Sequence, residues 1–308
     1  MFESLYDRSM DSLGYCCINT ELRERGIFCS RSMIKRTFSL SRASELALEN
    51  VKDLLRILKW NELHDIRVFR ISSEILPRYT CKTHRYSFTD LKDHEEISSI
   101  LGECGSYVKQ HNHEISFHPG PFTVLASPNK ESVNNSILEL EYHSMLCDML
   151  DPHDELDIPI NIHVGGSYNK TYEETANRFI EVYRGLSSNI RSRLVIENDD
   201  KGNCWSVKKL YDYLYLKIGI PITLDIHHWY FCHEEDRTLE EDYKLSRSTW
   251  GTRSQQIHYS ESKDENKMVP AHSYIYVNKL PSFLEGKYHV HLECKGKEQG
   301  LYALRDLG

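Results

Sequence analysis

The sequence lacks any apolar run that approaches the roughly 18 residues needed to span a bilayer. Its N-terminal residues also lack the basic-then-apolar order of a signal peptide. We therefore expect no membrane segment, and a location in the cytoplasm or nucleus. Low-complexity tracts, clear internal repeats and a visible domain linker are missing too, which argues against a repeat array or a multidomain chain.

A framework of paired cysteines is also missing. The nine cysteines are an odd number at irregular spacings, so we expect reduced thiols rather than disulfides. Nor is there an excess of positive charge, because 38 Lys and Arg stand against 46 Asp and Glu, a formal net charge of -8. Taken alone, this argues against a nucleic-acid-binding protein. Three bound divalent cations, each adding two charges, would leave a net charge of -2, so net charge does not decide the partner.

What the sequence does contain is an alternation of strand-length apolar runs with amphipathic segments of helical length, which predicts parallel βαβ units. We expect eight strands, at residues 12–18, 67–72, 114–118, 158–163, 193–197, 220–225, 256–259 and 288–293. Helices are expected at 44–63, 133–150, 172–186 and 205–216, with Ser44 and Asn203 as N-caps.

The predicted fold class is α/β, a single (β/α)8 TIM barrel over residues 1–308, with residues 1–11 as an N-terminal extension. The chain of 308 residues accommodates a barrel of about 250 residues with insertions. The helical pattern weakens late, since residues 236–251 are charged and weakly periodic and 260–267 is a polar run. We therefore expect an incomplete outer helix ring, with mostly loop and a short helix between the last two strands and a brief final helix.

Histidines and carboxylates recur at the ends of the predicted strands. His118, His163, Glu197, Asp225 and Glu293 end strands three, four, five, six and eight, His258 lies in strand seven, and His228 and His272 follow in loops. The C-terminal ends of the strands carry the active site in barrels of this type. A lone histidine there is more often a hydrogen-bonded loop residue, and a lone aspartate a helix cap. Because most strands contribute such a residue at the same end, we predict a multinuclear metal site at the barrel mouth.

The predicted ligands are nitrogen and oxygen donors, which suit zinc, manganese or iron(II) better than calcium or magnesium. Eight ligands are too many for one ion and fit two or three. His227 and His228 cannot both face the site if the strand continues, so we expect His228 to be the ligand and His227 its neighbour. Such a cluster favours phosphodiester hydrolysis by a metal-bound hydroxide, with aldose isomerisation as the competing chemistry.

The residues at these positions resemble those of the UV-damage endonuclease family. The resemblance covers nearly the whole chain, through Leu13-Gly14-Tyr15, Arg70-Ile71-Ser72-Ser73, His118-Pro119-Gly120, His163-Val164-Gly165-Gly166, Glu197-Asn198-Asp199, Asp225-Ile226-His227-His228 and Lys295-Gly296-Lys297-Glu298-Gln299. It implies a TIM barrel with two or three divalent ions, manganese first and zinc, iron or magnesium as alternatives. It also implies a nick in duplex DNA immediately 5′ to UV photoproducts, and to abasic sites.

The resemblance implies a role for each of these residues. The metal ligands would be His118, His163, Glu197, Asp225, His228, His258, His272 and Glu293, with Glu197 as a bridging carboxylate. Glu197, Glu293 and Lys295 are expected to act in catalysis. The expected DNA contacts are Tyr15, Asn19, Pro121, Phe122 and Lys297.

Three positions depart from the family pattern. The family's Gln-Tyr after His-Pro-Gly is Pro121-Phe122 here, which removes an amide and a hydroxyl but keeps a ring that can wedge between bases. Gln256 replaces a lysine that is carboxylated in some members, so we expect one ion to be weakly held or absent. The family's early histidine ligand aligns on Cys81, with His84 three residues further, and of the two we favour His84.

The primary hypothesis is a monomeric, metal-dependent DNA-repair endonuclease that acts on damaged double-stranded DNA. Two alternatives stay open. One is a sugar isomerase or epimerase on the same scaffold. The other is a lesion-binding protein with impaired catalysis, which the changes at Pro121 and Gln256 suggest.

Overall fold

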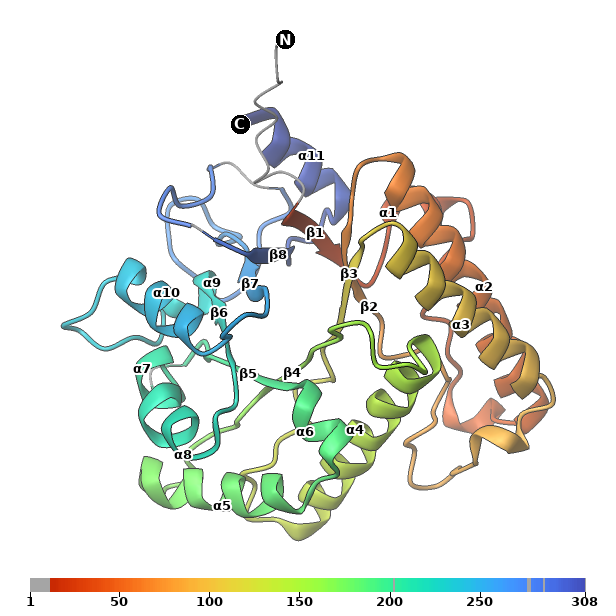
Figure 1. The fold of residues 1–308 in the computed structure, drawn as a ribbon, viewed down its shortest axis with the longest axis horizontal. Coiled ribbons are helices and arrows are strands. Elements are labelled where there is room, and N and C mark those ends of the chain that lie inside the picture. Colours follow the sequence, from red (N-terminus) through yellow and green to blue (C-terminus); the bar gives the residue numbers. More distant parts are fainter. Residues whose placement is uncertain (1–11, 202, 276–277, 285, 308) are drawn as a thin grey trace.

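A closed barrel of parallel strands forms the centre of the molecule. The computed structural model describes residues 12–201, 203–275, 278–284 and 286–307. Within them the eight strands follow one another around the barrel in sequence order (Figure 1). They are β1 (Leu13–Cys16), β2 (Val68–Ile71), β3 (Glu114–Phe117), β4 (Ile160–His163), β5 (Leu194–Glu197), β6 (Ile222–Asp225), β7 (Gln255–Tyr259) and β8 (Tyr288–Leu292). Each strand overlaps its predicted range, and the predicted TIM barrel is confirmed; the predicted extension at residues 1–11 lies outside the described residues.

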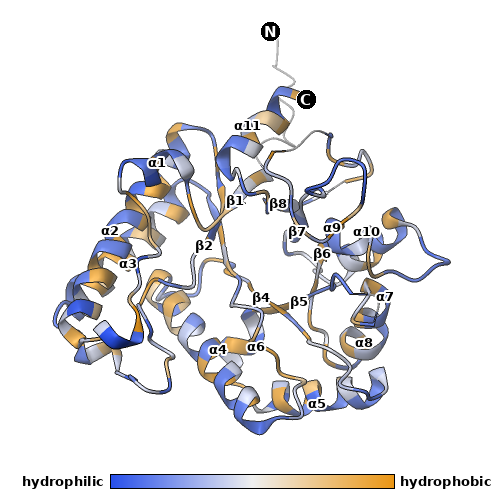
Figure 2. Cartoon of the chain, turned by 180° about the vertical axis from the view of Figure 1, so that it is seen from behind, coloured by the Kyte–Doolittle hydropathy of each residue, from blue (hydrophilic) through white to orange (hydrophobic). Residues whose placement is uncertain are grey.

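Helices surround the barrel (Figure 1). The longer ones are α2 (Leu40–Leu63), α3 (His94–Gln110), α4 (Lys130–Leu150), α5 (Tyr172–Gly185), α10 (Leu239–Ser248) and α11 (Glu298–Leu307). The shorter ones are α1 (Thr20–Glu24), α6 (Ser188–Arg193), α7 (Val207–Leu210), α8 (Leu216–Ile218) and α9 (Ile226–Trp229), and a π-helical turn over Tyr211–Tyr215 joins α7 to α8. Figure 2 shows apolar and polar residues on the same long helices, as expected when one face packs against a barrel.

Two predicted helix caps are wrong. Helix α2 begins earlier than expected because Ser39 caps it, with its Oγ accepting a backbone N–H of the first turn at 3.2 Å. Ser44 is instead buried within the helix, where its hydroxyl donates to Asp93 at 2.8 Å. Helix α7 is capped by Ser206 rather than Asn203.

The outer ring is incomplete, as predicted. In the described part of the chain no helix lies between β7 and β8, so the short helix expected there is missing. The final helix α11 is short and packs against β1. None of the helices within the described ranges has the length and apolar character that crossing a membrane requires.

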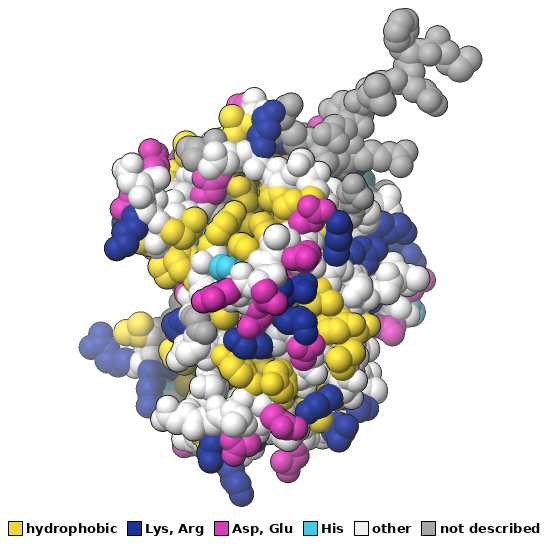
Figure 3. Space-filling model, turned by 90° about the vertical axis from the view of Figure 1, so that its left-hand side faces the viewer, with side chains coloured by type: hydrophobic (Ala, Val, Ile, Leu, Met, Phe, Trp, Pro, Cys, Tyr) yellow, Lys and Arg dark blue, Asp and Glu magenta, His cyan; other side chains and the backbone are white. Residues whose placement is uncertain are grey.

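The outer surface over α7 and α10 carries charges of both signs. Figure 3 shows Lys and Arg side chains there interspersed with Asp, Glu and apolar groups, rather than a continuous basic surface. Lys209 of α7 pairs with Glu234 at 3.0 Å, and Lys244 of α10 pairs with Glu240 at 2.6 Å. This face therefore provides no obvious attraction for a polyanion.

The first two strands show which side chains enter the barrel. Tyr15 of β1 points outward, because its hydroxyl donates to Asn61 of α2 at 2.6 Å and its ring contacts Phe69 at 5.1 Å between centroids. Side chains alternate along a strand, so Cys16 and Arg70 face the barrel axis. The axis is therefore lined on this side by a thiol and a guanidinium.

A polar layer lies one step below the barrel mouth. Ser116, Asn161, Thr223, Gln256 and His291 each stand two residues before a predicted ligand and share its inward face. All five are at most 3% exposed. Branched apolar residues usually fill such layers in TIM barrels. Within this layer Asn161 donates a hydrogen bond to Glu197 above it, and Gln256 Nε2 lies 3.4 Å from His291 Nε2.

Candidate metal centre

Side chains from six consecutive strands meet at the C-terminal end of the barrel. His118 directly follows β3, His163 ends β4, Glu197 ends β5, Asp225 ends β6, His258 lies near the end of β7 and Glu293 directly follows β8. The barrel thus brings residues 175 positions apart in the chain to one opening, the result that parallel strands with shared polarity predict.

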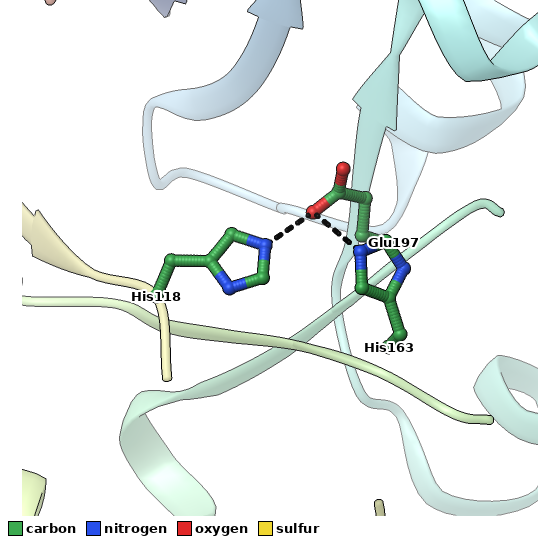
Figure 4. Close-up of side chains that lie close together, drawn as sticks. All are labelled: His118, His163 and Glu197. Carbon is green, nitrogen blue, oxygen red and sulfur yellow. Dashed lines mark hydrogen bonds and ion pairs between the residues drawn. The ribbon is translucent and has the colours of Figure 1, made fainter. Parts of the chain in front are cut away.

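Glu197 is the central group. Its side chain is 1% exposed, and its Oε2 lies 3.0 Å from His118 Nε2 and 3.9 Å from His163 Nε2 (Figure 4). The other oxygen, Oε1, lies 3.2 Å from His258 Nδ1. Asn161 of the polar layer donates a hydrogen bond to Oε2 and fixes the carboxylate from below. A carboxylate with imidazoles facing both oxygens is suited to bridge two ions.

Two sets of ligand atoms can each surround an ion. Donor atoms of His118, His163 and Glu197 lie within 4.8 Å of one another, and so do those of Glu197, Asp225 and His258. The two sets share Glu197, so the ion sites they offer are adjacent. His228 stands beside both, with Nδ1 3.3 Å from Glu197 Oε1 and 3.7 Å from Asp225 Oδ2.

Burial and close charged neighbours shift the pKa values of the carboxylates and imidazoles in the cluster. Burial raises the pKa of Glu197, but His258 and His163 outweigh burial and hold it well below its ordinary value. Burial raises the pKa of Asp225 to about 7, and His228 offsets this only partly. Burial lowers the pKa of His228, yet Asp225 and Glu197 together raise it well above its ordinary value. Buried carboxylates thus draw positive charge to the barrel mouth, the charge that divalent ions supply.

Several buried polar atoms in the cluster have no hydrogen-bond partner. They are His163 Nδ1, Asp225 Oδ2, both ring nitrogens of His258, and His272 Nδ1. Leaving such an atom unpaired costs about 1–3 kcal/mol. Imidazole nitrogens and carboxylate oxygens are ordinary ligands of manganese, iron and zinc. The residues present therefore fit a metal centre.

Glu293 forms the outer edge of the cluster. Its Oε1 lies 3.4 Å from His258 Nδ1, and its Oε2 lies 4.0 Å from His272 Nδ1. Its carboxylate is also ion-paired with Arg70 of β2. Burial raises the pKa of Glu293, but Arg70 and His258 outweigh burial and hold it far below its ordinary value. Of the two predicted histidine ligands beside Glu293, His272 therefore lies further from its carboxylate than His258 does.

Known proteins are similar in sequence to this chain over almost its full length. The family model described as UV-endonuclease UvdE matches residues 11–307. The chain belongs to this family. The UV-damage endonuclease of Schizosaccharomyces pombe is 31% identical over 307 residues, which cover 95% of this chain and 50% of that protein. The putative UV-damage endonuclease of Acanthamoeba polyphaga mimivirus is 31% identical over 307 residues, which cover 96% of this chain and 90% of that protein.

A solved structure of the UvdE family shares the whole barrel. SacUVDE aligns with a TM-score of 0.81 and 32% identity, over 96% of this chain and 98% of its own. The chain spans about half the length of the fungal relative. The resemblance seen in the motifs is confirmed at the level of the family.

Tyr15 and Asn19, two of the predicted DNA contacts, lie in the interior of the structure. Tyr15 and Asn19 are both 0% exposed. Asn19 donates to the Tyr15 hydroxyl at 2.9 Å and caps α1 by accepting the backbone N–H of Leu22 at 2.8 Å. In this structure both side chains hold β1 against α1 and α2, and their contact with a lesion stays a prediction.

The early ligand position was predicted at Cys81 or His84, with His84 favoured. The ring of His84 packs on Phe38 at 4.6 Å, and its Nδ1 lies 2.9 Å from Thr83 Oγ1. No contact found in the described residues joins His84 to the cluster. Cys81 instead lines a cavity of about 460 Å³ together with His118, and a hydrogen bond with Thr83 lowers the pKa of its thiol to about 6. Cys81 thus lies nearer to the cavity beside His118, while His84 as the early ligand stays a prediction.

The remaining predicted residues lie around the opening. Phe122 is 91% exposed in the loop after β3, beside an exposed Pro121, and it lines the same cavity as His118. Lys295 is exposed and is tied through its backbone to the loop between β7 and β8. Lys297 is half-buried, and its charge adds to burial in lowering the pKa of His272.

Two inward residues that contact the cluster were not predicted. Asn161 bonds to Glu197, and Arg70 pairs with Glu293. Asn161 stands two residues before His163 in the same strand, so the period of two along a strand was the signal that could have found it. His227 was expected to be a neighbour of the ligands, and it is buried with its ring 5.4 Å from that of His272.

Proposed function

We propose that this chain is a metal-dependent endonuclease that nicks duplex DNA immediately 5′ to UV photoproducts. The observation that carries the proposal is the pair of ligand sets that share Glu197, in a chain that belongs to the UvdE family. Paired ion sites are a recurring means of stabilising both the attacking and the leaving oxygen in phosphoryl transfer. Damaged double-stranded DNA is the proposed substrate, with abasic sites as a further lesion.

The ligands divide between two ions. His118, His163 and Glu197 would hold one ion, and Glu197, Asp225 and His258 the other, while His228, His272 and Glu293 surround the pair. When bound, such ions ionise a water molecule and neutralise charge on the phosphodiester. Manganese is the first expectation, with zinc, iron or magnesium as alternatives. Gln256 lacks the lysine amine that could be carboxylated, which supports two ions over three.

The chain's own residues prepare the site in other ways. Asn161 holds Glu197 in one orientation, and Arg70 does the same for Glu293. The exposed ring of Phe122 is placed to wedge between bases beside the opening. Turning a damaged nucleotide out of the helix costs least where pairing is already weakened. Lesion choice is therefore proposed to depend on Phe122 and on the weakness of the damaged pair.

Monomeric state and intracellular location remain part of the proposal. The chemistry does not require a second copy of the chain, because every predicted ligand comes from one chain. Size-exclusion chromatography of the purified protein tests the first, and a fluorescent fusion in the source cell tests the second.

The two alternative functions require different features at the barrel mouth. A sugar isomerase or epimerase needs a pocket around a small polyol and gives no reason for an exposed Phe122. A lesion-binding protein with impaired catalysis would keep Phe122 but lose an ion through Gln256. Both are separated from the primary proposal by asking whether damaged DNA is cut.

The test is incision of an end-labelled duplex that carries one cyclobutane pyrimidine dimer. We expect a single nick immediately 5′ to the dimer with Mn²⁺, and no nick with EDTA or on the same duplex without the dimer. Binding of the damaged duplex without any nick at all metal concentrations would support the lesion-binding alternative. Turnover of ketoses with no effect on either duplex would support the epimerase.

A further inference from the structure

A buried cation stands beside the ligands but takes no part in holding an ion. The side chain of Arg70 is 12% exposed and that of its partner Glu293 is 14% exposed. A charge so buried persists only when it is paired. One guanidinium nitrogen serves Glu293, whereas Nε is buried with no hydrogen-bond partner. The guanidinium therefore retains donor capacity that the protein itself does not use.

The strand between Arg70 and Glu293 makes room for this pair. Strand β1 lies between β2 and β8, and its inward positions are Gly14 and Cys16. A Cβ at Gly14 would lie 1.9 Å from the backbone oxygen of Val68. That contact shows how closely β1 packs against β2, and the inward residue level with Arg70 is the small Cys16. Arg70 can therefore extend past β1 and reach Glu293.

Arg70 occupies the side of the opening that lacks metal ligands. The cluster residues come from β3 through β8, so β1 and β2 form the one arc without them. Its partner Glu293 lies 3.4 Å from His258 and 4.0 Å from His272, so the guanidinium stands beside the ligands. A phosphodiester that approaches the ions from their uncoordinated side would come within reach of this guanidinium.

We propose that Arg70 contacts the phosphodiester held at the barrel mouth, through the N–H donors that Glu293 leaves free. The planar fork of a guanidinium matches two phosphate oxygens, and its charge persists at any physiological pH. The group would then stabilise the negative charge that builds up on the phosphate during cleavage. This inference rests on the proposed function, since it assumes that a phosphate is the group bound there.

The bland alternative is that Arg70 merely neutralises Glu293. A lysine at position 70 could neutralise Glu293, but it could not offer the planar pair of donors that contacts two phosphate oxygens. Arg70→Lys keeps the charge beside Glu293 but loses the fork, so it separates neutralisation from phosphate contact. Arg70→Gln removes both, and Arg193→Gln is a matched control. Arg193 is also buried, with a side chain that is 8% exposed, and its guanidinium lies 2.6 Å from the carboxylate of Asp148. This pair is not part of the ligand cluster.

The experiment loads each protein with Mn²⁺, counts bound ions by elemental analysis, and then measures binding of inorganic phosphate by titration calorimetry. We expect Arg70→Lys and Arg70→Gln to bind as many ions as the unmodified chain. Their phosphate affinity should fall by roughly 10- to 100-fold, the loss expected for a charged hydrogen bond. Arg193→Gln should bind phosphate like the unmodified chain.

Two results would overturn the inference. One is unchanged phosphate affinity in Arg70→Lys, which would leave neutralisation as the whole role of Arg70. The other is loss of an ion in Arg70→Lys, which would make Arg70 a positioning residue for Glu293. If Arg70→Gln does not fold, Arg70→Lys alone decides. Because DNA cleavage is not measured, failure here stays distinct from failure to incise the damaged duplex.

Discussion

At the scale of single residues, the two proposed ion sites share one carboxylate. Glu197→Gln keeps the size of the side chain and its contact with Asn161, but it removes the charge shared by both ligand sets. We expect ion affinity to fall by at least about 100-fold, more than the loss usual for a supporting residue. Incision should then be undetectable. Elemental analysis and the incision assay measure the two effects.

A matched carboxylate provides the control. Glu62 is a partly buried glutamate paired with His113 at 2.8 Å, outside the ligand cluster. Glu62→Gln should keep the ions and the incision activity. Retention of two ions by Glu197→Gln would contradict the bridging role of Glu197.

Glu62 also gives the chain a pH-dependent stability. Burial raises its pKa, but hydrogen bonds from Arg67 and His113 outweigh burial and lower the pKa from 4.5 to about 2. A lowered pKa in the folded state stabilises the fold above the unfolded-state pKa, and that stabilisation disappears as the pH falls through the folded-state pKa. We expect Glu62→Gln to cost about 1 kcal/mol at pH 7, a figure reduced for solvent screening.

Urea unfolding of both proteins between pH 7 and pH 2 measures this effect. The difference in the free energy of unfolding should stay constant down to about pH 5 and shrink towards zero below the unfolded-state pKa of 4.5. A difference that stays constant down to pH 2 would show that the charge of Glu62 contributes nothing.

The sequence was sufficient to find most residues of the cluster, and its failures have a physical cause. His163 and Glu197 end apolar runs, so the strand end and the ligand appear together in the sequence. The burial of Tyr15 was not predicted, because residues 12–18 are apolar on both faces of the strand, which hides which face is inward. Arg70 was missed because a single cation in a strand reads as solvent-exposed until its partner on a distant strand is known.

At the scale of elements, α3 shows how packing overrides local preference. It contains Gly102 and Gly105, poor helix formers, and the sequence analysis did not predict it. A Cβ at Gly105 would lie 1.6 Å from the backbone oxygen of Leu150, at the end of α4. The helix exists because it fits closely against its neighbours, information that a local window of sequence does not hold. Strands were easier to predict, since each is an apolar run between polar segments.

The two glycines of α3 should respond in opposite ways to alanine. Gly105→Ala forces α3 away from α4, and we expect a loss of about 3 kcal/mol or more in the free energy of unfolding. At Gly102 the nearest atom to a new Cβ is 4.0 Å away, so Gly102→Ala should gain up to about 1 kcal/mol from helix propensity. Thermal unfolding of both variants checks the pair. Equal effects of the two substitutions would contradict the packing seen between α3 and α4.

The loop after β3 is the second element with a specific prediction. Phe122→Ala removes an exposed ring and should leave stability and ion content unchanged. Affinity for a dimer-containing duplex should fall by roughly 10-fold, because one stacking contact is worth about 1–3 kcal/mol. Leu63→Ala is the control, since Leu63 is 82% exposed at the end of α2. Electrophoretic mobility shifts give the affinities, and equal affinities for both variants would exclude a role for the Phe122 ring.

At the scale of the whole molecule, a net charge of -8 must be reconciled with a polyanionic substrate. The face over α7 and α10 carries charges of both signs (Figure 3), so that face is not expected to attract DNA, whereas the barrel mouth is. There the ions and Arg70 would offset the carboxylates. The sequence could predict the barrel and the class of chemistry, because both follow from repeated strand ends. It could not predict how charge is distributed, since that depends on which side chains the fold brings together.

The rate of incision as a function of Mn²⁺ bound per chain tests this account most directly. Metal-free protein is titrated with Mn²⁺, the bound ions are counted, and the nick at a single pyrimidine dimer is followed at each step. The account predicts no incision by the metal-free chain and a rate that reaches its maximum as the second ion binds. Incision by the metal-free chain, or no incision with both sites filled, would contradict it.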